Sequence, residues 1–85
     1  MLNDVEIQGK MLEALYTIAP EIRGINQIPD NSNLQETFDL DSVDLVRYLA
    51  KLEEFFSISL AGDSYRSFLT IKDGMEVLKM KLDKA

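Results

Sequence analysis

Residues 38–46 read FDLDSVDLV, a stretch that places the hydroxyl of Ser42 between two aspartates where an amphipathic pattern begins. From Ser42 to about Ser57, apolar residues return at helical spacing, within a narrow arc at about 100° per residue. They are Leu45, Leu49, Leu52 and Phe56. Fully burying these side chains contributes about 6–12 kcal/mol gross, less than the backbone entropy lost over the segment. The pattern predicts a helix that is stable only when packed against others.

The first helix is predicted between Asn3 and Ala19. Asn3 suits an N-cap, and Glu6 three residues later completes the pattern of a capping box. Pro20 opposes an unbroken helix, so we expect the helix to end near Ala19. Its apolar stripe is formed by Ile7, Met11, Ala14, Leu15, Ile18 and Ile22.

The last helix is predicted to begin at Thr70, which forms a second capping-box pattern with Asp73. Its apolar stripe runs through Ile71, Met75, Leu78 and Leu82. Before it, residues 58–68 contain Gly62 and several serines, and they predict a loop with only a short helical turn.

The connection between the first two helices is long. Residues 20–41 contain Gly24, Pro29 and a polar cluster at 30–33, which predict an ordered loop rather than another helix. A loop of this length in a small domain usually serves a function. Four apolar residues should hold it across the core: Ile25, Ile28, Leu34 and Phe38.

Together these segments predict an all-α fold, a small antiparallel four-helix bundle of three main helices and one short helix, with a long loop between the first and second. The chain has 85 residues, of which 46% are hydrophobic, enough for one core and not for two. It contains no internal repeat and no linker rich in glycine, proline or serine. We therefore predict a single domain over residues 1–85.

Composition excludes several classes of function. The chain has no cysteine and no histidine, so disulfides are impossible and the usual general base near neutral pH is missing. Independent catalysis is therefore not expected. No apolar run is long enough for a membrane helix, and the N-terminus MLNDVEIQGK lacks the pattern of a signal peptide. We expect a cytoplasmic protein without a membrane span.

The charge distribution favours a basic protein as the partner. The formal net charge is −6. Nucleic acid and anionic lipid select for clustered Lys and Arg, so we expect neither as the partner. The negative charge is densest in residues 30–44, which contain no base and five acids: Asp30, Glu36, Asp39, Asp41 and Asp44.

Ser42 fits two roles at the start of its helix. Its hydroxyl could be the N-cap, or Asp41 could be the cap and leave the hydroxyl free for modification. The nearby carboxylates would repel a free phosphate, whereas a covalently attached phosphate needs no affinity of its own. In the second case the acidic residues around Ser42 serve to bind a partner and not to hold the group attached to Ser42.

This region resembles the acyl carrier protein family. Asp41-Ser42-Val43 matches the family's attachment motif, Asp-Ser-Leu at the start of the second helix. Residues 52–56, LEEFF, match the family's later Leu-Glu-Glu-x-Phe segment without a gap. The order and spacing of the predicted helices fit the family over nearly the whole chain.

The resemblance implies that Ser42, with Asp41 in the attachment motif, carries 4'-phosphopantetheine, transferred from coenzyme A by a phosphopantetheinyl transferase. The arm supplies a thiol, on which acyl groups are held as thioesters. The chain would then be a carrier and not an enzyme, delivering acyl groups to enzymes of fatty-acid, polyketide or related lipid biosynthesis. Basic surfaces of these enzymes would dock beside Ser42. The expected contacts are Asp41, Val43, Asp44, Val46, Arg47, Ala50, Glu53 and Glu54.

The chain departs from the family pattern in three places. The glycine common shortly before the serine is absent, Val43 replaces leucine, and Arg47 stands where many fatty-acid carriers have an acid. These changes leave the attachment chemistry intact. They weaken the assignment to housekeeping fatty-acid synthesis and open specialised pathways as alternatives, such as polyketide, modified-lipid or aminoacyl transfer.

Two alternatives and one excluded site complete the prediction. One alternative is an aminoacyl or peptidyl carrier, and the other is a helical adaptor without a prosthetic group, in which Ser42 is only a cap. A calcium loop of the EF-hand type fails at Val43, Asp44 and Ala50, so we predict no metal site. The expected oligomeric state is a monomer.

Overall fold

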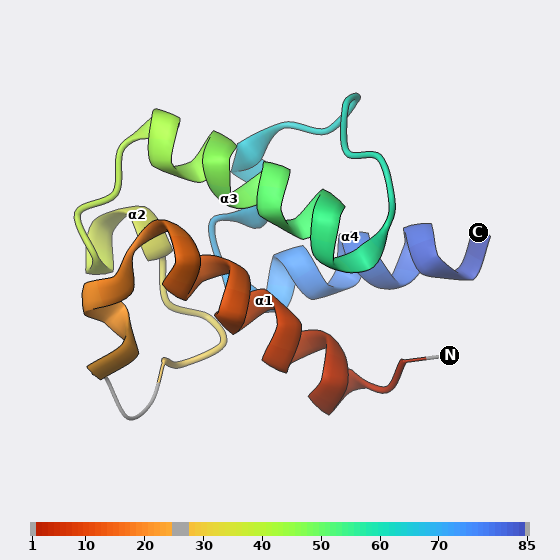
Figure 1. The fold of residues 1–85 in the computed structure, drawn as a ribbon, viewed down its shortest axis with the longest axis horizontal. Coiled ribbons are helices and arrows are strands. Elements are labelled where there is room, and N and C mark those ends of the chain that lie inside the picture. Colours follow the sequence, from red (N-terminus) through yellow and green to blue (C-terminus); the bar gives the residue numbers. More distant parts are fainter. Residues whose placement is uncertain (1, 25–27, 85) are drawn as a thin grey trace.

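The computed structural model describes residues 2–24 and 28–84, and within these ranges it contains helices and loops but no strand. Figure 1 shows α1 running in the opposite direction to α3 and α4. This confirms the predicted all-α bundle with three long helices. The α-helices are α1 (Asp4–Ile18), α2 (Leu34–Thr37), α3 (Ser42–Phe56) and α4 (Ile71–Lys84), and the 3-10 helices are η1 (Pro20–Gly24) and η2 (Tyr65–Phe68).

The first helix begins and ends where the sequence predicts. The Glu6 N–H donates to Asn3 Oδ1 at 2.8 Å, and the Asn3 N–H donates to Glu6 Oε1 at 3.3 Å. This reciprocal capping box satisfies two backbone donors that the first turn of a helix leaves free. At the other end, Ala19 caps α1 and Pro20 opens η1.

The core is apolar and is built from the inner faces of the three long helices. α1 contacts both α3 and α4, while η2 contacts α3 and α4 from the other side. Among the described residues, no buried side chain is charged, and Tyr48 is the one buried side chain of the core that carries a polar group. Packing of these apolar side chains supplies the main driving force for folding. The fully buried large side chains are Ile7, Met11, Leu15, Ile22, Leu34, Leu45, Tyr48, Leu52, Phe68, Ile71 and Leu78.

The prediction that residues 20–41 contain no helix was wrong, because the 3-10 helix η1 and the short α-helix α2 lie inside this segment. The short helical turn predicted within residues 58–68 is confirmed as the 3-10 helix η2. Asn33 starts α2, because its Oδ1 accepts the Glu36 N–H at 3.0 Å. Leu34, at the first position of α2, is fully buried. A local cap and one buried side chain therefore produce a helical turn too short to show a period of its own.

The long connection is attached to the core as predicted. The Leu34 N–H donates to the Leu69 carbonyl at 2.7 Å, and the Lys72 N–H donates to the Asp30 carbonyl at 2.9 Å. Leu34 is buried, while Ile28 and Phe38 are half-buried against the core. Ile25, the fourth predicted anchor, lies outside the described residues.

No helix in residues 2–24 and 28–84 is both long enough and apolar enough to cross a lipid bilayer.

Gly74 allows α4 to approach its neighbours closely. A Cβ atom at this position would lie 2.7 Å from Met11 Cε and 2.9 Å from Phe68 Cδ2. Gly9, in the middle of α1, is exposed, and a Cβ atom there would meet no atom within 4 Å. The two helical glycines thus differ in whether a methyl group fits.

We expect Gly74→Ala to destabilise the protein by about 1 kcal/mol net, because overpacking against Phe68 outweighs the helix propensity gained by alanine. Gly9→Ala should stabilise the protein by about 0.5–1 kcal/mol, because there the gain is unopposed. Urea unfolding followed by circular dichroism measures both variants. Equal effects of the two substitutions would contradict the proposed close packing at Gly74.

Tyr48 places a hydroxyl in the apolar core. The side chain is fully buried, and its hydroxyl has no hydrogen-bond partner among the residues that the structure describes. Burial raises the pKa of Tyr48 above its usual value of 10.0, because the core cannot solvate a phenolate. The hydroxyl therefore costs stability instead of adding to it.

We expect Tyr48→Phe to increase the free energy of unfolding by about 1 kcal/mol at neutral pH, since it removes an unpaired polar group and keeps the ring. The unfolded chain ionises at Tyr48 near pH 10 and the folded chain does not, so this residue lowers stability as pH rises above that value. The advantage of the variant should therefore grow in alkali. Urea titrations at pH 7 and pH 10.5 test both statements, and a less stable variant would contradict them.

Candidate functional site

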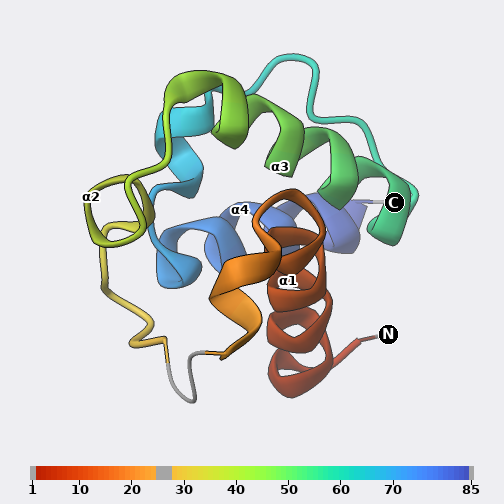
Figure 2. The same cartoon turned by 60° about the vertical axis from the view of Figure 1, so that its left-hand side comes forward.

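The candidate site lies where α3 begins. α3 lies along the top of the bundle in both views, and α1 and α4 lie below it (Figures 1 and 2). Its inner face carries the buried residues and its outer face is open to solvent. Only residues 38–41 separate α2 from α3, so their backbone geometry decides where α3 begins and in which direction it runs.

Asp39 turns the chain from α2 toward α3. It has a positive φ of 54°, a left-handed conformation that glycine adopts most easily and that aspartate tolerates better than most residues. The Leu40 N–H donates to the Gln35 carbonyl at 3.0 Å across this residue, as in a Schellman motif. Leu40 is buried directly after the turn. The glycine missing from the sequence pattern is thus replaced by an aspartate that ends one helix before the next begins.

Asp41 is the N-cap of α3. Its Oδ1 accepts the Asp44 N–H at 2.8 Å, and Asp44 Oδ2 accepts the Asp41 N–H at 3.2 Å. The two aspartates therefore form a capping box, the arrangement more often made by Ser or Thr with Glu. Negative charge in the first turn is also favourable beside the positive end of the helix dipole.

Ser42 is released from capping by this arrangement. It is the first residue of α3, its side chain is exposed, and no described residue hydrogen-bonds its hydroxyl. Of the two roles that the sequence left open, N-cap or free hydroxyl, the structure gives the free hydroxyl. A primary alcohol at the exposed tip of a helix can be reached by an enzyme that esterifies it.

Five predicted contact residues lie on the outer face of α3. Val43 and Val46 are 63% and 56% exposed, and among the described residues only Val5 and Met80 are other large apolar side chains that are exposed. Arg47, Ala50 and Glu54 are exposed on the same helix. An apolar centre with charged neighbours is typical of a protein-binding surface.

Asp44, Glu53 and Glu54, three of the acidic residues predicted as contacts, each bond to another part of the chain. Asp44 is half-buried in the capping box. Glu53 is half-buried, and its Oε2 accepts the Leu60 N–H at 2.7 Å, which ties the loop after α3 to the helix. Glu54 is exposed and pairs with Lys51 at 3.0 Å. The sequence did not indicate the Glu53 bond, because the two residues are joined only by the path of the loop.

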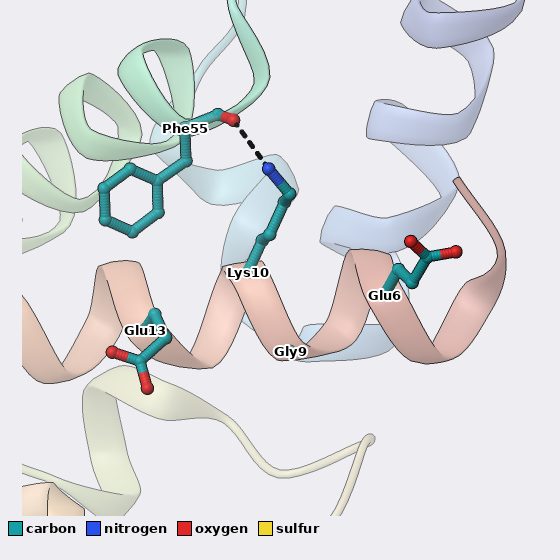
Figure 3. Close-up of a pocket in the computed structure, with 5 residues that line it drawn as sticks. All are labelled: Glu6, Gly9, Lys10, Glu13 and Phe55. Carbon is teal, nitrogen blue, oxygen red and sulfur yellow. Dashed lines mark hydrogen bonds between the residues drawn. The ribbon is translucent and has the colours of Figure 1, made fainter. Parts of the chain in front are cut away.

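A second surface feature lies at the other end of α3. A groove of about 520 Å³ is lined by Glu6, Gly9, Lys10 and Glu13 of α1 and by Phe55 of α3 (Figure 3). The Lys10 ammonium donates to the Phe55 carbonyl at 3.3 Å, where a cation is favourable near the C-terminus of α3. Phe55 is thirteen residues from Ser42, about 20 Å along the helix, so this groove is separate from the candidate site.

No group of three or more Asp and Glu side chains in the described ranges is arranged to hold a metal ion. The polar groups at the start of α3 are instead two mutually bonded aspartates and one free hydroxyl.

Curated relatives of this chain include two acyl carrier proteins. The chain is 33% identical over 58 residues to the acyl carrier protein of Phytoplasma mali (strain AT), an alignment covering 68% of this chain and 69% of that protein. It is 30% identical over 54 residues to the acyl carrier protein of Lactobacillus acidophilus, covering 64% of this chain and 68% of that protein. No family model and no solved structure matches the chain.

We expect Asp39→Gly to be more stable than Asp39→Ala by about 1 kcal/mol, because alanine resists the left-handed conformation and glycine does not. Both variants lose the same carboxylate, so the difference between their stabilities reflects the backbone conformation and not the lost charge. Thermal or urea unfolding of the two proteins measures it. If the alanine variant were the more stable, residue 39 could not have the positive φ described here.

Proposed function

The chain belongs to the acyl carrier protein family, and on that premise we propose that it carries acyl groups on 4'-phosphopantetheine attached to Ser42. The single observation that carries this proposal is the exposed Ser42 hydroxyl, left free because Asp41 is the N-cap. A serine used as the cap would have to give up its hydrogen bond when esterified. Here attachment leaves the capping box intact.

The residues around Ser42 fit the attached group. The free backbone N–H groups of the first turn and the helix dipole favour an anion such as a phosphodiester. When bound, the group supplies a terminal thiol that holds an acyl group as a thioester. The chain itself holds the attachment point at the tip of a rigid, capped helix, and we propose that it acts as a carrier and not as a catalyst.

The proposed partners are a phosphopantetheinyl transferase and the acyl-transfer and synthase enzymes that use the loaded carrier. The outer face of α3 offers them Val43 and Val46 beside Ser42, within the acidic region around Asp41 and Asp44. Acidic charge of this kind attracts basic surfaces over a distance and speeds association. Glu53 remains a proposed contact, although one of its oxygens already binds the loop.

The proposal extends to pathway and setting. The departures from the family pattern, above all Arg47, favour a specialised fatty-acid, polyketide or related lipid pathway. We further propose that the carrier works as a cytoplasmic monomer, since fast exchange between several enzymes suits a small protein with one exposed docking face.

Incubation of the purified chain with coenzyme A and a phosphopantetheinyl transferase should raise its intact mass by one phosphopantetheine group. Ser42→Ala should abolish this gain and leave the fold unchanged, because Asp41 still caps α3. Ser59→Ala, which removes another exposed hydroxyl, is the matched control and should be loaded normally. Mass spectrometry reads the loading and circular dichroism reads the fold.

Two results would refute the proposal. One is a wild-type chain whose mass stays constant with an active transferase, which would favour an adaptor without a prosthetic group. The other is normal loading of the Ser42→Ala variant.

Loading should also slow as salt rises, because the attraction between the docking surfaces is screened.

A further inference from the structure

Arg47 interrupts the acidic region at the centre of the docking face. It is the single base within residues 30–50, and it is exposed on the outer face of α3. Val43 precedes it by four residues and Ala50 follows it by three, so both lie beside it on the helix surface, and Val46 is its neighbour in sequence. The positive charge thus lies among the exposed apolar side chains.

The folded chain makes no use of this charge. Ion pairs among the described residues join Arg23 to Glu13, Lys51 to Glu54, Lys79 to Asp4 and Lys81 to Asp63, and none includes Arg47.

The neighbours of Arg47 on α3 explain the lack of an ion pair. Asp44 lies three residues earlier, but its Oδ2 is directed to the Asp41 N–H. Lys51 lies four residues later, carries the same charge and is paired with Glu54. Internal stability therefore gives no reason for an arginine at position 47.

Docking gives such a reason. A partner that covers Val43 and Val46 must also remove water from the guanidinium beside them. A charge taken out of water without a counter-charge is costly, whereas an arginine paired with a carboxylate at an interface contributes to affinity and to orientation. No acid among the described residues pairs with Arg47, and Asp44 Oδ2 is bonded within the capping box.

We propose that Arg47 determines which enzymes the docking face accepts, by pairing with a carboxylate on the partner. The inference rests on the proposed function, since it concerns the enzymes that dock beside Ser42. The fitting partner is then mixed in charge, with basic groups toward the aspartates at the start of α3 and one acid opposite Arg47. An enzyme with a basic residue opposite Arg47 is repelled. Arg47 therefore excludes enzymes whose carrier-binding surface is basic throughout.

The transferase of the same organism is the probe, because the proposed function requires it to dock at Ser42, about 7–8 Å from Arg47 along the helix axis. We would measure kcat and KM for loading of the wild type, Arg47→Glu, Arg47→Lys and Arg66→Glu. Arg66 is exposed in η2 and not on α3, and its replacement changes the net charge equally.

Arg47→Glu should raise KM at least about tenfold with kcat within about twofold of the wild type, while Arg66→Glu should change neither by more than about twofold. Arg47→Lys should fall between wild type and Arg47→Glu, because lysine keeps the charge but loses the two-pronged contact. A transferase in which the opposing acid is replaced by lysine should restore loading of Arg47→Glu. Circular dichroism confirms that each variant is folded.

The outcomes separate the two proposals. If the wild type is loaded and Arg47→Glu has an unchanged or lower KM, the pairing is refuted and the carrier function stands. If Arg66→Glu raises KM as much as Arg47→Glu, net charge and not a specific contact is responsible, which also refutes the pairing. If the wild type is never loaded, the proposed function fails and this inference fails with it.

Discussion

The reciprocal hydrogen bonds between Asp41 and Asp44 are the contact on which the candidate site depends. They satisfy backbone donors at the start of α3, and they do so with two carboxylates instead of the adjacent hydroxyl. Ser42 is consequently exposed, unbonded and held at the first position of a regular helix. Had the serine been the cap, modification of its oxygen would remove a stabilising contact from the helix that presents it. The two aspartates cap the helix, and the serine hydroxyl is left free.

The same separation of roles extends to the rest of the helix. One side of α3 packs into the core through Leu45, Leu52 and their neighbours. The opposite side exposes two valines and Arg47, which forms no ion pair with any residue that the structure describes. The core contains no buried charge among the described residues, so it is insensitive to what binds outside. A surface of this kind can change its partners by substitution without a large loss of stability.

Several features of the fold could be predicted from single positions because their causes are local. The Asn3 and Glu6 capping box, the end of α1 before Pro20 and the amphipathic stripe of α3 each follow from interactions within about one turn of helix. The short helix α2 could not be placed, since it exists because Asn33 caps it and because Leu34 fits into a core formed by distant helices. A period cannot be detected in a single turn.

For the candidate site, the sequence by itself determined the chemistry available: one hydroxyl between two acids at a helix start, an acidic region around it, and neither cysteine nor histidine for catalysis. Only the tertiary structure decided which oxygen caps the helix and which side chains remain free for a partner. The physical reason is that a residue's spacing in the chain fixes where it lies on its helix, whereas capping geometry and burial depend on the path of the surrounding chain. Asp39 in its left-handed turn and Glu53 bonded to the loop at Leu60 both belong to this second kind of information.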